Sequence, residues 1–248
     1  MSGDSGGGKI AFFGEQPVAV AFVESARGVE VARVVAQIVA HFEWTGPVGV
    51  TLPAVVTAGV ARSAANIDRA WIGADANALF ADALGRERVT VLNDADAAGV
   101  AEGQYGAGDG KAGVVVLLTL GTGIGSAVLV DGVLLPNTEL GHLEVGGKEA
   151  EHRAASSVKD ARNLSLREWA DEVSKVFEAI EALLSPDLFI VGGGISRDGE
   201  KWIPLLVNRT PVVAAKLLNT AGIVGAALAS SAYEDHDPEL RELAGVAT

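Results

Sequence analysis

Short apolar runs alternate along this chain with longer segments in which helix-forming residues predominate. A short apolar run that is bounded by glycine, proline or polar residues predicts a buried β-strand. Such runs occupy residues 10–13, 18–23, 48–52, 89–92, 188–191 and 212–213. The longer segments predict helices over residues 29–42, 75–84, 97–105, 149–158, 166–184 and 222–232. Because strands and helices alternate in both halves, the pattern indicates an α/β fold with two lobes.

The longest apolar stretch, residues 114–130, is interrupted by a glycine-rich segment at residues 119–126. This pattern predicts two strands joined by a tight loop, and an Asp-Gly turn at residues 131–132 leads into a third strand. Glycines let backbone N–H groups approach a ligand closely, and Thr122 and Ser126 add hydroxyl donors. The segment is interpreted as a phosphate-binding loop, with a glycine-rich hairpin that binds no ligand as the alternative.

A glycine-rich linker at residues 106–113, which also contains Asp109 and Lys111, is the clearest predicted domain boundary. We expect an N-terminal lobe of residues 1–110 and a C-terminal lobe of residues 111–248.

The composition narrows the class of protein. The 248 residues include no cysteine, which excludes disulfides and thiolate metal sites and fits a reducing compartment. The net charge of −13 argues against general nucleic-acid binding, although a local cluster of basic side chains would still accept an anionic substrate. No apolar segment reaches the ~20 residues that span a membrane, and no signal peptide is recognisable. We therefore expect a cytoplasmic protein that binds neither nucleic acid nor a membrane.

Asn93 and Asp94 directly follow the apolar run at residues 89–92, where a strand is predicted to meet a helix. Ligands of open α/β sheets gather at the carboxyl ends of strands. A carboxylate there can take the proton from a sugar hydroxyl that attacks a phosphoryl group, and a neighbouring amide can orient the same sugar. The alternative is that Asp94 only caps the following helix.

Glu139 and His142 lie one turn apart, and Glu151 follows a few residues later. Carboxylates and an imidazole can bind several vicinal hydroxyls through paired donor and acceptor contacts. The same residue types are also metal ligands, so a metal site is the alternative.

The N-terminal segment contains an acidic residue, glycines and a lysine in the order typical of a second phosphate-binding turn. The residues concerned are Asp4, Gly6, Gly7, Gly8 and Lys9. A glycine- and serine-rich tail without a ligand is the alternative.

Several of these segments together resemble the ROK family of sugar kinases, and within it the polyphosphate-dependent glucokinases of actinobacteria. The segments that carry the resemblance are residues 63–73, 91–99, 120–126, 136–142, 185–196 and 219–226. The resemblance extends from about residue 46 to about residue 230 and implies a two-lobed, actin-like ATPase or hexokinase-type (ribonuclease H-like) α/β fold.

The resemblance also implies roles for individual residues. Asp94 matches the general base that activates the 6-hydroxyl of glucose. The positions that match sugar-binding residues are Asn66, Asn93, Glu139, His142 and Glu151. The positions that match phosphate and donor loops are Asp4, Gly6, Gly7 and Lys9, then Gly121, Thr122 and Gly123, then Gly192, Gly193 and Gly194. Asp4 would help to hold Mg²⁺ through water, although almost no strand precedes this loop and its spacing to Gly49 is shorter than in the family.

The implied reaction is transfer of a phosphoryl group to glucose from inorganic polyphosphate or from ATP, with Mg²⁺. The alternatives are an ATP-dependent ROK hexokinase for glucose, mannose or an amino sugar, and a glucose-binding ROK protein with impaired catalysis. A basic groove for polyphosphate would draw on Lys148, Arg153, Lys159, Arg162, Arg167, Arg197, Lys201, Arg209 and Lys216, with solvated helix faces as the alternative. The zinc site of many family members is not expected, because it needs cysteines. The family and the small residues near Gly222 predict a homodimer.

Overall fold

The computed structural model describes residues 10–13, 16–19, 28–64, 67–86 and 89–235. The chain forms two compact units, of which the first comprises residues 1–97 and 222–248 and the second residues 98–221. The sequence-based lobe boundary lies at residue 110, whereas the chain passes between the compact units inside a helix at residues 97–98 and returns at residues 221–222. The C-terminal helix therefore belongs to the first unit.

The second unit is built on a five-stranded sheet with the strand order β13-β12-β7-β8-β9. The strands are β7 (Val114–Leu120), β8 (Ile124–Val130), β9 (Val133–Leu135), β12 (Leu188–Gly192) and β13 (Val212–Ala214). β7, β8 and β9 pair antiparallel, which confirms the predicted hairpin and third strand. β12 pairs parallel with β7 and with β13. Gly192 stands opposite Thr119 in that register, so β7 and β12 end at the same edge of the sheet.

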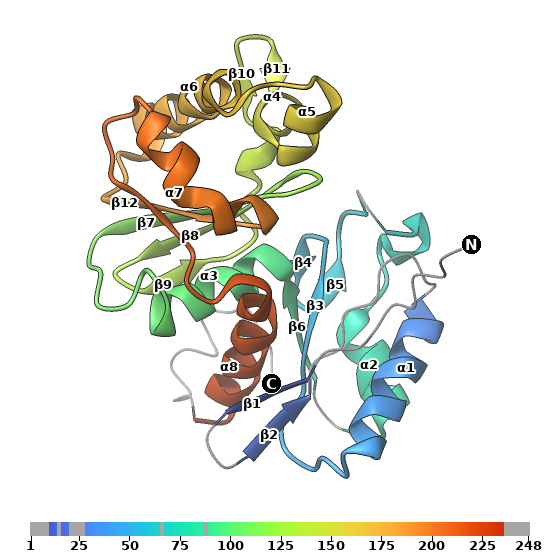
Figure 1. Cartoon of the computed structure of the whole chain (residues 1–248). Coiled ribbons are helices and arrows are strands. Elements are labelled where there is room, and N and C mark those ends of the chain that lie inside the picture. Colours follow the sequence, from blue (N-terminus) through green and yellow to red (C-terminus); the bar gives the residue numbers. More distant parts are fainter. Residues whose placement is uncertain (1–9, 14–15, 20–27, 65–66, 87–88, 236–248) are drawn as a thin grey trace. The chain divides into compact units, whose positions relative to one another are not determined.

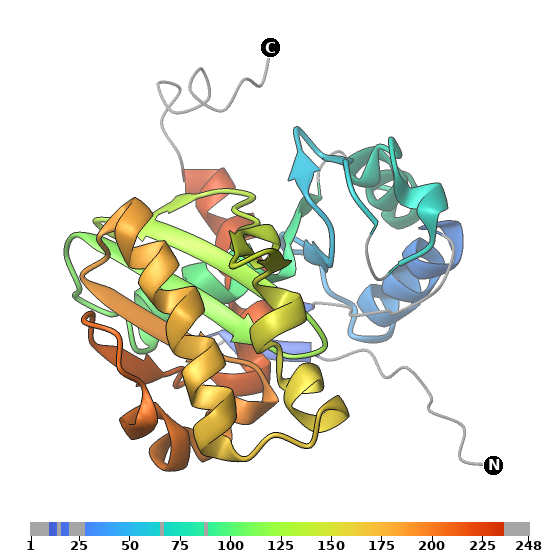
Figure 2. The ribbon, with the colours of Figure 1, turned by 90° about the horizontal axis from the view of Figure 1, so that it is seen from above.

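Helices cover both faces of this sheet (Figure 1). They are α3 (Asp94–Tyr105), which begins in the first unit, α4 (Glu151–Ala154), α5 (Ser156–Ala161), α6 (Leu166–Leu184) and α7 (Gly199–Trp202). α6 has the bounds that the sequence predicts, and Figure 2 shows it lying across the strands. A capping box of Ser165 and Glu168 defines its first turn. Its apolar side packs on the sheet, where the rings of Phe177 and Phe189 stack with centroids 4.5 Å apart.

The opposite face of the sheet is covered by α3, whose glycines allow a close approach. A Cβ atom at Gly99 would meet Ala127 of β8, and one at Gly103 would meet Leu129 of the same strand. Since glycine has no Cβ, the backbone of α3 packs directly on the side chains of Ala127 and Leu129.

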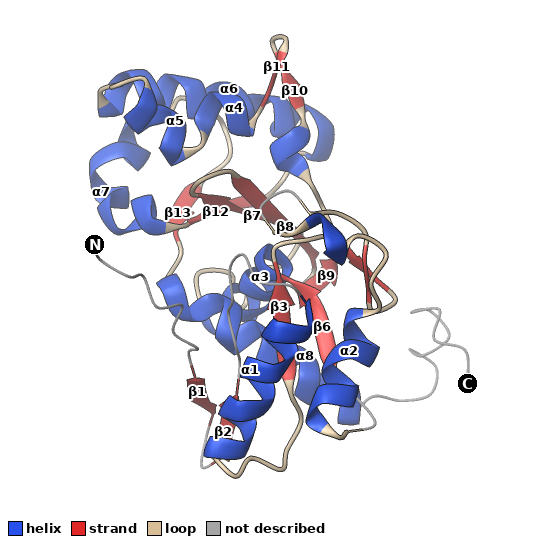
Figure 3. Cartoon of the chain, turned by 90° about the vertical axis from the view of Figure 1, so that its right-hand side faces the viewer, coloured by secondary structure: helices blue, strands red, loops and turns tan. Residues whose placement is uncertain are grey.

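Short elements connect the helices and strands of the second unit. The 3₁₀ turns are η2 (Leu140–His142), η3 (Gly194–Asp198), η4 (Ile203–Leu205) and η5 (Leu218–Thr220). β10 (Glu144–Val145) and β11 (Lys148–Glu149) form a small antiparallel hairpin, which projects from the unit in Figure 3.

The first unit contains the parallel strand pair β3 and β6 between two layers of helices. Its elements are β1 (Ile10–Phe13), β2 (Gln16–Ala19), α1 (Gly28–His41), β3 (Gly49–Leu52), β4 (Val56–Thr57), β5 (Val60–Ala61), η1 (Arg69–Trp71), α2 (Ala76–Leu84), β6 (Thr90–Asn93) and α8 (Ala221–Asp235). Successive residues of β6 face opposite sides: Val91 packs in a core with α1 and α2, and Leu92 packs on α8. α2 ends at Gly85, as predicted, in the left-handed conformation that favours glycine.

Glycines bring α8 into contact with the backbone of its neighbours in the first unit. A Cβ at Gly49 of β3 would overlap the carbonyl oxygen of Ala226, and a Cβ at Gly225 would overlap the carbonyl oxygen of Ala97. This packing explains why α8 joins the first unit although it is the last helix in the chain.

Two of the differences between predicted and observed helices have a cause that the structure shows. α3 begins at Asp94 rather than at residue 97, because the side-chain oxygen of Asn93 caps it and accepts hydrogen bonds from the backbone N–H groups of Ala95 (2.8 Å) and Asp96 (3.1 Å). The helix predicted over residues 149–158 is two short helices, because Ala155 has an extended backbone with ψ of 148°. Among the described residues, no helix is both long and apolar enough to cross a membrane.

Substitution of Gly225 by alanine is expected to destabilise the protein by about 2–3 kcal/mol, because the added methyl group overlaps the backbone of α3. Gly222→Ala is the matched control in the same helix, since its Cβ would lie 4.0 Å from the nearest atom, the carbonyl oxygen of Asp94. That variant is expected to be neutral or up to ~1 kcal/mol more stable. Urea unfolding followed by circular dichroism measures both changes, and equal stability of the two variants would contradict the proposed close packing.

Candidate functional site

The predicted catalytic residue Asp94 lies at the first turn of α3, in the first unit. Its carboxylate accepts a hydrogen bond from the N–H of Ala95 at 2.9 Å. Asn93 caps α3, because its side-chain oxygen accepts from the N–H groups of the second and third helical residues. The start of the helix therefore does not require capping by Asp94. Asn93 is buried and its amide group also donates to the carbonyl of Ala54 at 3.1 Å, which fixes the side chain at the end of β6.

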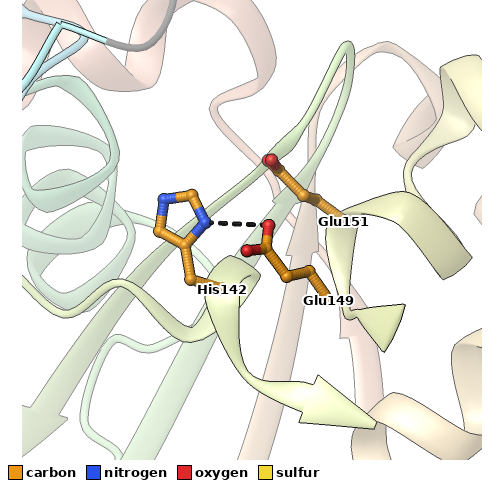
Figure 4. Close-up of side chains that lie close together, drawn as sticks. All are labelled: His142, Glu149 and Glu151. Atoms are coloured by element: carbon orange, nitrogen blue, oxygen red, sulfur yellow. Dashed lines mark hydrogen bonds and ion pairs between the residues drawn. The ribbon is translucent and has the colours of Figure 1, made fainter. Parts of the chain in front are cut away.

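The second unit brings together most of the other predicted sugar-binding residues. The carboxylate of Glu149 lies 3.3 Å from Nδ1 of His142, and Figure 4 shows Glu151 beside this pair. Glu139 lies 3.7 Å from Nε2 of the same imidazole. His152 adds a second imidazole, 3.6 Å from Glu149. The cluster is half-exposed, so its donors and acceptors remain accessible to a ligand with several hydroxyl groups.

His142, Glu149 and Glu151 each offer one ligand atom, and these atoms lie within 4.8 Å of one another. An imidazole with two carboxylates suits zinc or another transition metal better than Mg²⁺, which prefers oxygen ligands in near-octahedral geometry. The arrangement is thus compatible both with hydroxyl binding and with the metal site that the sequence left as the alternative.

The central phosphate loop lies directly beside this cluster. Oε2 of Glu151 is 3.5 Å from the N–H of Ile124, and a Cβ at Gly123 would come within 2.5 Å of the same oxygen. On the other side of the loop, Ser156 donates to the carbonyl of Gly121 at 3.0 Å and Ser157 donates to the carbonyl of Thr122 at 2.6 Å. With these carbonyls bound to α5, the loop is held between α5 and the carboxylate of Glu151.

The predicted donor loop, Gly192 to Gly194, lies at the same edge of the sheet. Gly193 has a φ of +85°, and its Cβ would lie 2.6 Å from the carbonyl oxygen of Leu120 at the end of β7. Only glycine combines this conformation with so close an approach. Ser196 fixes the turn by donating to the carbonyl of Gly193 at 2.7 Å. Both glycine loops of the second unit are therefore neighbours.

Arg153 holds the helix that presents Glu151. Its guanidinium donates to the carbonyl of Val145 through Nε (3.1 Å) and Nη2 (2.9 Å), and to the carboxylate of Glu172 on α6 at 2.5 Å. Burial alone would raise the pKa of Glu172, but hydrogen bonds from Lys175 and Arg153 outweigh it, and the pKa lies below its ordinary value of 4.5.

Several predicted site residues lie outside the described part of the chain, and others form ion pairs with neighbouring carboxylates. Asp4, Gly6, Gly7, Lys9 and Asn66 are outside the described residues. Of the basic residues considered for a groove, three form ion pairs within the second unit: Arg153 with Glu172, Lys159 with Asp160, and Lys201 with Asp198.

Sequence reasoning did not find Glu149, Ser156 or Ser157. Glu149 belongs to a two-residue strand, and the hairpin that turns it toward His142 has no strong periodic signal. The adjacent serines lay inside the helix predicted over residues 149–158, and their contact with the loop 35 residues earlier is a tertiary feature.

Comparison with known proteins shows the family to which the chain belongs. The sequence pattern of the ROK family matches residues 23–153, and the chain belongs to this family. The polyphosphate glucokinase of Mycobacterium leprae is 62% identical over 206 residues, which are 83% of this chain and 64% of that protein. The polyphosphate glucokinase of Mycobacterium tuberculosis strain H37Rv is 61% identical over 206 residues, which are 83% of this chain and 78% of that protein.

Among solved structures, the inorganic polyphosphate/ATP-glucomannokinase of Arthrobacter sp. strain KM matches with a TM-score of 0.80 and 46% identity over 90% of each chain. The predicted hexokinase-type fold and the resemblance to ROK sugar kinases are thereby confirmed.

Glu172→Gln is expected to lower the free energy of unfolding by about 2 kcal/mol at pH 7, because a charged hydrogen-bond acceptor is lost from a largely buried ion pair. Since the pKa of Glu172 is lowered in the folded protein, its contribution is complete above 4.5 and disappears as the pH falls through the lower, folded-state value.

Urea unfolding at pH 7 and at successively lower pH tests this linkage. The difference between the original protein and Glu172→Gln should shrink below pH 4.5. Glu178→Gln, at an exposed position of α6, is the control and should change stability little at either pH. A difference that does not depend on pH would rule out the proposed ionic contribution.

Proposed function

We propose that this protein is a polyphosphate- and ATP-dependent glucokinase, which transfers a phosphoryl group to the 6-hydroxyl of glucose. The observation that carries the proposal is the position of Glu151. Its carboxylate belongs to the hydroxyl-binding cluster around His142 and also contacts the phosphate loop at Ile124 and Gly123. An acceptor sugar and a phosphoryl donor would therefore meet at this carboxylate. The identity to two mycobacterial polyphosphate glucokinases supports the same substrates.

Glucose would be bound through its vicinal hydroxyls by Glu139, His142 and Glu151, and Asn66 and Asn93 are further sugar-binding residues that the family resemblance implies. Glu149 would orient the imidazole of His142, since the 3.3 Å contact uses Nδ1 and leaves Nε2 toward Glu139 and the ligand. A cluster of paired donors and acceptors selects a polyhydroxylated substrate over an apolar one.

Asp94 would act as the general base. Its carboxylate would accept the proton of the 6-hydroxyl as the oxygen attacks the terminal phosphoryl group of the donor. The bond from that phosphorus to the bridging oxygen would break, and ADP or the shortened polyphosphate would leave. Gly121, Thr122 and Gly123, together with Gly192, Gly193 and Gly194, would bind the donor through backbone N–H groups. Asp4 in the first phosphate loop, with Gly6, Gly7 and Lys9, would hold Mg²⁺ through water, and the ion would supply neutralisation of the donor's charge.

We further propose a cytoplasmic homodimer, as the family resemblance suggests. The candidates for contact with a long polyphosphate are the basic residues that form none of the three ion pairs above, namely Lys148, Arg162, Arg167, Arg197, Arg209 and Lys216.

The first experiment measures formation of glucose 6-phosphate with Mg²⁺ and with either long-chain polyphosphate or ATP as the sole donor. We expect turnover with both donors, and we expect the KM for glucose to be similar whichever donor is used. Mannose and N-acetylmannosamine in place of glucose test the alternative acceptors. Turnover with ATP alone would leave an ATP-dependent hexokinase, and clear glucose binding without turnover would favour a sugar-binding protein with impaired catalysis.

Asp94→Asn is expected to lower kcat by about 10²–10⁴-fold, because the amide cannot accept the proton, while glucose binding measured by calorimetry stays unchanged. Asp75→Asn is the matched control in the first unit, since Asp75 caps α2 by accepting from the N–H of Ala78 at 2.9 Å. If Asp94 were only a cap, both variants would keep full turnover, because asparagine is an equally good cap.

A further inference from the structure

Glu102 is a completely buried carboxylate on α3 that the proposed mechanism does not use. Its side chain is 0% exposed. It accepts hydrogen bonds from three backbone N–H groups: those of Ala107 (2.7 Å), Lys216 (3.1 Å) and Leu217 (2.6 Å). A buried carboxylate needs such partners, because leaving it without them is energetically expensive. Two of the three donors lie more than a hundred residues away in the sequence.

The segment that Glu102 holds borders the proposed donor loop. β13 pairs with β12 in parallel, and the N–H of Ala215 continues this pairing by donating to the carbonyl of Val191 at 2.8 Å. Lys216 and Leu217 follow directly, and η5 then packs against η3, the turn that begins at Gly194. The position of residues 215–218 therefore defines one side of the Gly192–Gly194 loop.

Residues 215–218 also contain a strained backbone conformation that neighbouring contacts must hold in place. Leu218 has a φ of +50°, a left-handed conformation that is strained for a residue with a Cβ. Such a conformation persists where the surrounding contacts determine it. The two N–H groups immediately before Leu218 are those bound by Glu102.

The chain leaves room for this carboxylate at Gly106. A Cβ at Gly106 would overlap Oε2 of Glu102, the oxygen that binds the N–H groups of Ala107 and Lys216. Alanine at this position would displace the carboxylate without removing its charge.

We propose that Glu102 is a positioning residue for the phosphoryl donor, ATP or polyphosphate: it holds the backbone of Lys216 and Leu217 against α3 and so places the Gly192–Gly194 loop. This inference rests on the proposed function of that loop. Glu102 touches neither substrate, so its loss should affect the binding of the donor and leave the binding of glucose unchanged.

The test compares Glu102→Gln and Gly106→Ala with a matched buried carboxylate. Glutamine presents one acceptor oxygen and an NH₂ group, so it cannot accept from all three N–H groups. The control is Glu181→Gln on α6, because Glu181 is also buried and accepts from the backbone N–H of Thr210, at the other end of β13. All three variants are expected to lower the melting temperature, and circular dichroism shows whether each is folded.

Only Glu102→Gln and Gly106→Ala are expected to raise KM for ATP and for polyphosphate, by about tenfold, which corresponds to the loss of one strong contact. KM for glucose should stay unchanged in both. An equal rise in the donor KM in Glu181→Gln, or an unchanged donor KM in both Glu102→Gln and Gly106→Ala, would overturn the proposal.

Calorimetric binding of AMPPNP and of tripolyphosphate separates this inference from the proposed function. If the original protein transfers no phosphoryl group, the proposed function fails, but weaker binding of these probes to Glu102→Gln than to Glu181→Gln still supports the positioning role. If the original protein is active and all variants bind both probes equally, the positioning role fails and the proposed function stands.

Discussion

The parallel register of β7 with β12 is the constraint on which the candidate site of the second unit depends. Because Thr119 stands opposite Gly192, the two strands end together and both glycine loops begin at one edge of the sheet. The close approach of Gly193 to the carbonyl of Leu120 then joins the loops directly. A shift of the register by one residue would turn Phe189 and Val191 away from α6 and separate the loops at the same time, so the apolar core and the site enforce one alignment.

The acidic cluster is connected to this edge through a single carboxylate. Glu151 contacts the phosphate loop on one side and lies beside His142 and Glu149 on the other. Arg153, two residues later, ties the same short helix to α6 and to the β10–β11 hairpin. A helix of four residues has little stability of its own, so the ion pair with Glu172 supplies the rigidity that a binding residue requires.

The sequence predicted local features well and tertiary features poorly. Apolar periodicity predicted the bounds of α6, and the Asp-Gly turn predicted the connection from β8 to β9, because these signals act over a few residues. The split of the predicted helix at Ala155, the return of α8 to the first unit, and the contact of Glu149 with His142 depend on partners distant in sequence. Gly225 illustrates the limit: its place in a helix was predictable, but its contact with Ala97 requires the fold.

The short edge strand β13 is anchored by a buried carboxylate near each of its ends. It is three residues long and, among the strands that the structure describes, pairs only with β12. Glu181, from the helix on one face of the sheet, binds the backbone just before the strand, and Glu102, from the helix on the other face, binds the backbone just after it. Each carboxylate gives a hydrogen-bond partner to backbone N–H groups of the segments that flank the strand. Because the two restraints come from opposite faces, β13 cannot slide or tilt without breaking one of them, and the glycine loop that follows β12 keeps a fixed neighbour.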